Sequence, residues 1–359
     1  MSSKVCPKIT TEPHHDPTAF DTLADEWAAL LRRSASDTLF LTPAYQRVWW
    51  HHLGEGELLL LTAREGGDLL GVASLFAVER AGEGRVLEIV GCVEVADYLD
   101  LILTTGREEE VLAAMLDFLD GPDAPLWDLM DLCNIHRDSP TLLFLPVLAR
   151  ARGWAVETEV QEVCPVVALP ATWEEYLVSL NRKNRHELRR KLRRAEATKG
   201  LHWYIVGPEH DLDAEVEDFL DLMAKSAPEK EAFLIPAMRA FFRELARATF
   251  DAGWLQLAFL ELNGRKLAAY INFVYNNRVL VYNSGLDWRA DPGLGAGIVL
   301  AGFLIRRAIE EGRGVYDFLR GDEAYKYRFG GKDVTVHRIM VRREGWNTNC
   351  ANGMKKAES

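Results

Sequence analysis

Residues 293–319 are GLGAGIVLAGFLIRRAIEEGRGVYDFL. The alternating glycines at 293, 295 and 297 predict a tight turn, because glycine adopts backbone angles that other residues avoid. Residues 298–310 are largely apolar and predict a buried helix, and residues 315–319 predict a strand. A glycine-rich turn, a buried helix and a strand in this order favour an α/β unit with one crossover helix.

The strands around this segment predict an antiparallel sheet. Residues 254–262 and 267–275 have the composition of strands and flank Asn263-Gly264, a strong signal for a two-residue hairpin turn. Residues 278–283 and 334–341 predict two more strands. The predicted fold class is therefore α/β (α+β), with a mixed, largely antiparallel sheet flanked by helices.

Helices are predicted on the N-terminal side of these strands. Thr172 and Glu175 form a capping-box pattern that opens a helical region reaching about residue 199. Asn181 is expected to divide that region into two helices. Residues 209–226 and 236–251 are amphipathic and predict two further helices.

The first half of the chain repeats this order. Residues 58–78 comprise a strand, a Gly66-Gly67 turn and a second strand, and further strands are predicted at 86–90, 126–132 and 157–168. Helices are predicted at 19–33, 42–50, 107–119 and 140–152, and residues 1–18 are expected to be loose. The sequence therefore predicts a duplicated α/β domain, with copies at 1–165 and 166–345 and a flexible tail at 346–359.

The composition is that of a globular protein with an uneven charge. The 359 residues are 48% hydrophobic and 27% charged, and the formal net charge is -12. This acidity excludes a general nucleic-acid or membrane-surface binder. Residues 181–199 nevertheless hold nine Lys or Arg and two Glu, a local charge of +7, which leaves -19 for the rest of the chain. An isolated helix with so much like charge is unstable, so an anionic partner is expected there.

That anion has three candidates: the phosphates of coenzyme A, an anionic glycan or lipid-linked sugar, and an aminoacyl-tRNA. We expect ligand contact from the basic residues that begin this segment, Arg182, Lys183, Arg185 and Arg189.

The cysteines and histidines indicate neither a disulfide framework nor a metal site. The five cysteines are odd in number and widely spaced, without a C-x-x-C pair, so all five are expected to be reduced. The pairs His14-His15 and His51-His52 are adjacent and do not share a helix face, and no H-E-x-x-H motif occurs. We therefore expect no metal.

The N-terminus lacks the apolar run of a signal peptide, and no apolar stretch reaches the ~20 residues of a membrane span. A cytoplasmic protein without a membrane span is expected. The sequence leaves its oligomeric state open.

Several enzyme classes are excluded by the absence of their motifs. The chain contains no G-x-G-x-x-G with an acidic ribose ligand, no G-x-x-x-x-G-K-[ST] and no G-x-S-x-G. Dinucleotide oxidoreductases, P-loop ATPases and α/β-hydrolases are therefore not expected.

A dense polar cluster follows the strand at 315–319, where an open sheet forms its ligand crevice. Such a cluster holds residue types that can take up or release a proton and stabilise a developing negative charge. Asp317 or Asp322 can serve as the base, Tyr325 as the acid, and Arg320 or Lys326 as the electrostatic clamp.

Two residues at the end of the preceding strand, Tyr282 and Asn283, are expected to line the same pocket.

Three stretches of the second half resemble a known family. They are YLVSLNRKNRHELRRKLRR at 176–194, GLDWRADPGLG at 285–295 with its following helix, and YDFLRGDEAYKYRF at 316–329. Together they resemble the acetyltransferase domain of CelD/BioF2-like proteins, which belong to the GNAT superfamily and are related to the Fem-type aminoacyl transferases of peptidoglycan synthesis. The resemblance implies two tandem GNAT-like domains, of which the first is degenerate.

The resemblance also implies where a cofactor binds. GNAT enzymes hold the pyrophosphate of acyl-CoA at the N-terminus of the central helix, where backbone N–H groups and the helix dipole favour an anion. The matching residues here are Gly293, Gly295, Ala296 and Gly297. The superfamily's Gln/Arg anchor is missing, because Ala290 and Pro292 occupy its positions and the nearest cation, Arg289, is one residue out of step.

The leading functional hypothesis is an acyl-CoA-dependent N- or O-acyltransferase, with acetyl-CoA as the expected donor. Its unidentified acceptor is a small molecule or is related to cell-envelope polysaccharide biosynthesis. A Fem-like transferase that uses aminoacyl-tRNA is a second hypothesis, motivated by the basic segment. A non-catalytic binding module of an envelope polysaccharide system is the third, motivated by the missing anchor.

Overall fold

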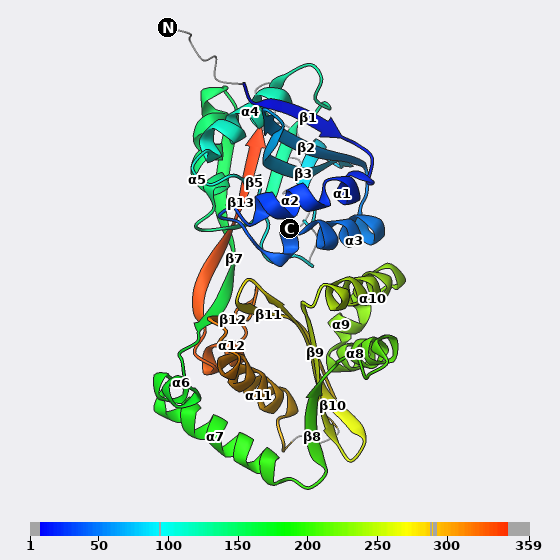
Figure 1. Cartoon of the computed structure of the whole chain (residues 1–359), viewed down its shortest axis with the longest axis vertical. Coiled ribbons are helices and arrows are strands. Elements are labelled where there is room, and N and C mark those ends of the chain that lie inside the picture. Colours follow the sequence, from blue (N-terminus) through cyan, green and yellow to red (C-terminus); the bar gives the residue numbers. More distant parts are fainter. Residues whose placement is uncertain (1–7, 93–94, 288, 290–292, 344–359) are drawn as a thin grey trace, which may run out of the picture. The chain divides into compact units, whose positions relative to one another are not determined.

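The computed structural model describes residues 8–92, 95–287, 289 and 293–343, and the chain divides into two compact units. The first unit comprises residues 1–162 together with 335–359, and the second comprises 163–334. Each unit is a mixed, largely antiparallel sheet flanked by helices (Figure 1), which confirms the predicted fold class. The predicted tail at 346–359 lies outside the described residues.

The sheet of the first unit has the order β1-β2-β3-β4-β6-β13. These strands are β1 (Thr10–His14), β2 (Glu57–Glu65), β3 (Asp68–Arg80), β4 (Gly84–Ile89), β6 (Leu129–His136) and β13 (Lys332–Arg342), and a short β5 (Ile102–Leu103) also pairs with β3. Only the β4–β6 pair is parallel among these described strands. Residues 10–14 pair with β2, so the expectation of a loose N-terminus was wrong for this segment.

The helices of the first unit are α1 (Ala19–Thr22), α2 (Ala24–Leu31), the 3-10 turn η1 (Leu39–Leu41), α3 (Pro43–Leu53), α4 (Glu108–Asp120) and α5 (Pro140–Ala151). The single helix predicted at 19–33 is broken at Leu23. Thr42 caps α3 as expected, because its side chain accepts a hydrogen bond from the N–H of Tyr45 and Pro43 occupies the first helical position.

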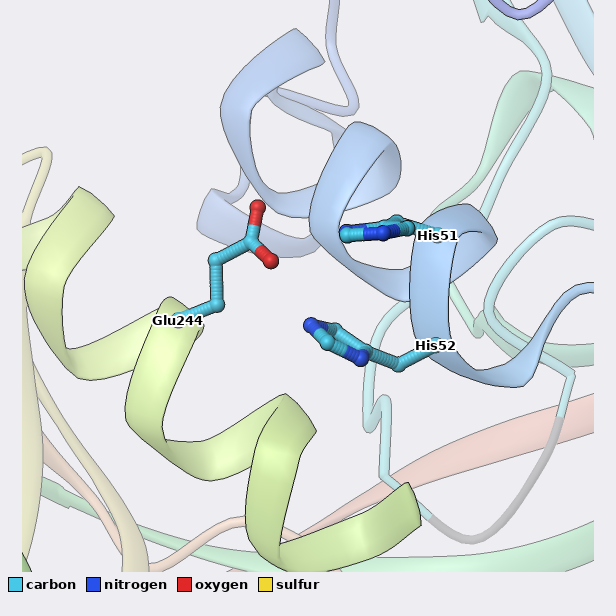
Figure 2. Close-up of side chains that lie close together, drawn as sticks. All are labelled: His51, His52 and Glu244. Carbon is cyan, nitrogen blue, oxygen red and sulfur yellow. The ribbon is translucent and has the colours of Figure 1, made fainter.

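The last turn of α3 carries His51 and His52 (Figure 2). Their ring centroids lie 4.4 Å apart, although the two residues are adjacent in the sequence.

The sheet of the second unit has the order β7-β12-β11-β10-β9-β8. These strands are β7 (Ala155–Ala168), β8 (Leu201–Ile205), β9 (Leu255–Leu262), β10 (Arg265–Tyr275), β11 (Arg278–Leu286) and β12 (Val315–Asp317). The turn between β9 and β10 is confirmed, since Asn263 and Gly264 both have positive φ as a tight hairpin requires. Strand β8, which pairs with β9, was not predicted.

The helices of the second unit are α6 (Trp173–Ser179), α7 (Arg182–Ala197), α8 (Leu212–Ser226), α9 (Pro228–Phe233), α10 (Pro236–Asp251), α11 (Ala296–Glu310) and α12 (Ala324–Arg328). Thr172 and Glu175 form the predicted capping box of α6. Asn181 caps α7 through its side chain, so the predicted division of this region is confirmed.

The core of the second unit brings α7 and α11 into close contact. Leu188, Leu192 and Ala195 are the buried residues of α7, and they belong to the same apolar cluster as the buried face of α11. A Cβ on Gly302 would lie 3.0 Å from Leu188 Cδ1 and 3.1 Å from Leu192 Cδ2. The absence of a side chain at this position therefore lets the two helices approach closely.

The two units exchange their last strands. In each, an antiparallel trio (β2-β3-β4 or β9-β10-β11) is followed by one parallel strand (β6 or β12), as the predicted duplication requires. The strand beyond β6 is β13, from the C-terminal part of the chain, and the strand beyond β12 is the end of β7. Residues 335–343 thus belong to the first unit, although the sequence placed everything up to 345 in the second domain.

One pair of cysteines differs from the expectation. Cys92 and Cys133 form a disulfide, and Cys164 is free and buried. The prediction of reduced cysteines was wrong for this pair. The two cysteines are 41 residues apart in the sequence, and their proximity depends on the fold. Among the described residues, no helix has both the length and the apolarity needed to cross a membrane.

The strand exchange makes β13 part of the core of the first unit. Ile339 is fully buried on β13 and pairs with Leu132 of β6, so Ile339→Ala should lower the free energy of unfolding by about 3 kcal/mol. Hydrogen exchange should speed up in β6 and leave β9 and β10 unchanged. Lys332→Ala, at an exposed position of the same strand, is the control. Faster exchange confined to β9 and β10 would contradict the exchanged arrangement.

Candidate functional site

A cavity of about 310 Å³ lies in the second unit, beside the N-terminus of α11. Strands β10 and β11, the first turn of α11 and helix α12 form its walls. Its lining residues are Leu267, Tyr270, Ser284, Leu286, Asp287, Gly295, Ala296, Gly297, Ile298 and Tyr325. Four residues that the sequence singled out, Gly295, Ala296, Gly297 and Tyr325, are thereby brought together.

The N-terminus of α11 is open toward a ligand. Gly295 is the N-cap in a left-handed conformation (φ 67°, ψ 52°), no side chain caps the helix, and its first turn contains no acidic residue. The first N–H groups of a helix have no partner within the helix, so here they are available to an anion. A Cβ at Gly295 would lie 2.5 Å from the Lys191 ammonium, the end of a flexible side chain, and the positive φ is what favours glycine here.

Two tyrosines, Tyr270 and Tyr325, line the cavity. Tyr270 is 3% exposed, and no described residue hydrogen-bonds its hydroxyl. Tyr325 is half-buried and packs edge-on against Phe318, with ring centroids 5.9 Å apart. Burial raises the pKa of both hydroxyls well above the usual value, and the negative charge of Glu323 adds to the effect. Both tyrosines are therefore protonated at neutral pH and can donate a hydrogen bond or a proton.

Asp317 lies at the end of β12 but does not line the cavity. Its side chain is fully buried, and one oxygen accepts a hydrogen bond of 2.9 Å from the N–H of Leu319. Leu319 has a φ of +56°, an unusual conformation for a bulky residue. The carboxylate of Asp317 therefore stabilises the strained turn that follows the strand, and Arg278 lies 3.8 Å away from it.

Lys326 is also buried, with 2% of its surface exposed. Its ammonium donates to the backbone carbonyls of Leu319, Arg320 and Gly321, and it lies 2.8 Å from the carboxylate of Glu323. These bonds hold the loop between β12 and α12 in place. Tyr325, the neighbour of Lys326 on α12, is positioned by the same contacts.

The other residues of the predicted polar cluster lie outside the cavity lining. Arg320 is half-buried and Asp322 is exposed. Gly293 offers its carbonyl to Arg194 at 3.0 Å, and Arg289 is exposed. Residues 290–292, which include both positions of the missing anchor, lie outside the described residues.

Tyr282 and Asn283, which the sequence places in the pocket, do not line this cavity. They contact other residues of the second unit instead. The ring of Tyr282 packs against Phe242 and Phe273, with centroids 5.9 and 5.0 Å away. The side-chain oxygen of Asn283 accepts a hydrogen bond of 2.9 Å from Lys230.

The predicted anion-binding residues of α7 are spread along the helix surface. Arg182, Lys183 and Arg189 are exposed, and Arg185 donates to the carbonyl of Val178 at 3.4 Å. None of these four lines the cavity beside α11. Arg189 instead belongs to a separate groove of about 470 Å³, lined by Trp173, Glu174, Leu177, His186, Arg189, Leu192, Arg193, Glu196 and Arg306.

A known protein family matches the part of the chain that contains this cavity. Residues 182–327 match the family model of the acetyltransferase (GNAT) domain. We call these matched residues, which form most of the second unit, the GNAT domain. The matched residues include α7, the first turn of α11 and the loop that Lys326 holds, so the family assignment and the cavity concern the same part of the chain.

Several solved structures are similar in fold to most of the chain, including the residues outside the GNAT domain. FemX aligns with 91% of this chain and 96% of its own, with a TM-score of 0.65 and 13% identity. L-PGS from Bacillus licheniformis covers 91% and 93% (TM-score 0.53, 11% identity). A tandem GNAT protein from the clavulanic acid biosynthesis pathway covers 92% and 98% (TM-score 0.50, 11% identity). The predicted class of tandem GNAT-like domains is thus confirmed at the level of the fold. No curated protein sequence matches the chain.

The GNAT domain also contains polar residues that the sequence did not single out. Lys230 of α9 donates to Asn283 Oδ1 and, at 2.6 Å, to the carbonyl of Ser284, which lines the cavity. Burial lowers the pKa of Lys230 to about 8. Nothing in the sequence around Lys230 or Tyr270 distinguishes them, because their importance depends on strand pairing and helix packing.

The role of Lys326 in the GNAT domain is testable. Lys326→Met removes the donor from three buried carbonyls and should lower the free energy of unfolding by about 3 kcal/mol. Chemical denaturation measures this change. Asp322→Ala, an exposed change in the same loop, should have little effect. Equal stability of both variants and the wild type would show that Lys326 does not hold the loop.

Lys230 should make stability depend on pH. Its pKa in the folded state, about 8, is lower than the value of about 10.4 for an unfolded lysine. Between these values the unfolded state binds more protons, so Lys230 makes the free energy of unfolding rise with pH. The stability difference between wild type and Lys230→Met should therefore shift by roughly 2 kcal/mol in favour of the wild type from pH 8 to pH 10. The exposed Lys225→Met should show no shift, and a shift of the opposite sign for Lys230→Met would contradict the assignment.

Proposed function

We propose that this protein is an acyl-CoA-dependent acyltransferase that acts on an amine or hydroxyl acceptor through the GNAT domain of its second unit. The observation that carries the proposal is that the uncapped N-terminus of α11 and Tyr325 line one cavity. The first feature fits a pyrophosphate, and the second fits the end of the ligand where chemistry occurs.

The residues present fit acyl-CoA. No side chain caps α11 at the left-handed Gly295, so the backbone N–H groups of the first turn are available to an anion. Leu267, Leu286 and Ile298 supply an apolar wall for an extended chain. When bound, acyl-CoA would supply an activated acyl thioester.

Tyr325 is proposed as the acid. Its raised pKa keeps the proton on Oη at neutral pH, and that proton can pass to the departing sulfur as the C–S bond breaks. Among the described carboxylates, Glu323 acts electrostatically on both Tyr325 and Tyr270. We propose that Glu323 takes the proton of the attacking amine or hydroxyl, because it is exposed and precedes α12 beside Tyr325, whereas Asp317 is fully buried; neither carboxylate lines the cavity. Tyr270 would donate a hydrogen bond within the same cavity.

We propose that the first unit does not use acyl-CoA. Its α4 occupies the place in the duplicated order that α11 has in the second unit. The first turn of α4 carries Glu108, Glu109 and Glu110, whereas that of α11 has no acidic residue. Three carboxylates at a helix N-terminus repel a pyrophosphate. The first unit then serves acceptor binding or stability, and we propose an acceptor related to the cell envelope or to a polysaccharide.

Acetyl-CoA binding tests the proposal directly. Isothermal titration with acetyl-CoA and longer acyl-CoAs should detect a complex, and Gly295→Ala should weaken it at least tenfold because the new Cβ enters the anion site. Gly312→Ala is the matched control, since Gly312 has a similar φ of +72° but open space around it. Failure of every acyl-CoA to bind the wild type would refute the proposal.

Tyr325→Phe tests the chemical step. It should lower kcat by about 100-fold or more and leave the KM for acyl-CoA nearly unchanged, because the hydroxyl acts in the transition state. Release of free thiol with a panel of amine and hydroxyl acceptors measures the rate. If the variant kept full activity, Tyr325 would not be the acid. A wild type that binds acyl-CoA and transfers it to nothing in the panel would favour a binding module instead.

A second candidate is transfer from aminoacyl-tRNA. The exposed cations of α7, with Trp173 and Arg306 in the neighbouring groove, favour a large anionic partner, and FemX shares the fold. A gel shift with aminoacyl-tRNA at physiological salt tests it. Binding that is lost in Arg189→Ala and is accompanied by no acyl-CoA binding would favour this candidate.

A further inference from the structure

A lysine of helix α7 lies at the N-terminus of α11. Residues 290 and 292, which precede α11 in the sequence, are Ala and Pro, and not the Gln or Arg that the family resemblance implies there. Helix α7, however, packs against α11 at Gly302 through Leu188 and Leu192. This packing places Lys191, which directly precedes Leu192 in the sequence, at the N-terminus of α11.

The ammonium of Lys191 points at Gly295. A Cβ on Gly295 would lie 2.5 Å from Lys191 Nζ, 3.6 Å from Cε and 4.0 Å from Cδ, so the end of the side chain is the part that approaches. Within the described part of the chain, Lys191 has no hydrogen bond and no ion pair. By contrast, Arg194 one turn away donates to the carbonyl of Gly293, and Arg306 pairs with Glu196.

The positive charges of Lys191 and of the N-terminus of α11 lie close together without an anion among the described residues. An uncompensated ammonium lies at the positive end of a helix dipole, where two charges of like sign repel each other unless an anion lies between them. Tyr270, which is 3% exposed and whose hydroxyl lacks a partner among the described residues, lines the same cavity. Both groups are satisfied by one ligand with an anionic end at Gly295 and a polar group near Tyr270.

We infer that Lys191 of α7 binds the diphosphate of the ligand at the N-terminus of α11, in place of the anchor that the loop lacks. The inference rests on the proposed function for the identity of the ligand. Charge-assisted hydrogen bonds from the ammonium to phosphate oxygens would supplement the backbone N–H groups of the first turn. In this inference only one turn of the basic helix α7 contacts the ligand.

The test compares Lys191→Met, which removes the charge and keeps the length, with Lys199→Met, which makes the same charge change at an exposed position beyond α7. Titrations use acetyl-CoA, S-acetylpantetheine, which has no phosphate, and inorganic pyrophosphate. Lys191→Met should bind acetyl-CoA about tenfold more weakly and S-acetylpantetheine unchanged. Lys191→Arg should restore much of the affinity, and Lys199→Met should match the wild type.

The outcomes separate this inference from the proposed function. If the wild type binds acetyl-CoA and Lys191→Met binds it equally well, the inference is wrong and the function stands. If the wild type binds no acyl-CoA, the function fails, and pyrophosphate then decides the inference. If the wild type binds pyrophosphate and Lys191→Met does not, Lys191 belongs to an anion site for a ligand other than acyl-CoA. If the wild type does not bind pyrophosphate either, the inference is wrong.

Discussion

The contact between α7 and α11 at Gly302 is the constraint on which the candidate site depends. Leu188 and Leu192 approach the α-carbon of Gly302 so closely that a methyl group there would be in tight contact with both. The same approach sets the distance between Lys191 and Gly295. The apolar side of a very basic helix thus holds one of its charges against the open end of the central helix, and hydrophobic packing determines an electrostatic feature.

Much of the fold could be predicted from local patterns. The Asn263-Gly264 turn, the Thr172–Glu175 capping box and the Asn181 cap are encoded within a few residues, and each has the predicted role. Strand β8 and helices α9 and α12 are short and lack a strong periodic signal, so they were missed. The Cys92–Cys133 bond and the strand exchange join residues that are distant in the sequence. Local sequence patterns do not predict such contacts.

The candidate site shows the same division. The glycines and Tyr325 form a recognisable motif, and they line the cavity. Asp317 and Lys326 belong to the same motif, yet they are buried and support the loop that carries Tyr325. Residue type alone does not distinguish a charged group that meets a ligand from one that holds the backbone. Lys191 and Tyr270 are defined by neighbours on other elements, so only the folded chain identifies them.

The exchange of β7 and β13 has a consequence for how the chain is made. Strand β6 ends at residue 136, but its neighbour β13 begins at residue 332. During synthesis from the N-terminus, the first sheet therefore retains an unpaired edge until nearly the whole chain has emerged from the ribosome. Such an edge is prone to mispair with other strands, and long-range pairing of this kind folds slowly. Strands β7 to β12 of the second unit all end by residue 317, so their pairing with one another can be completed first.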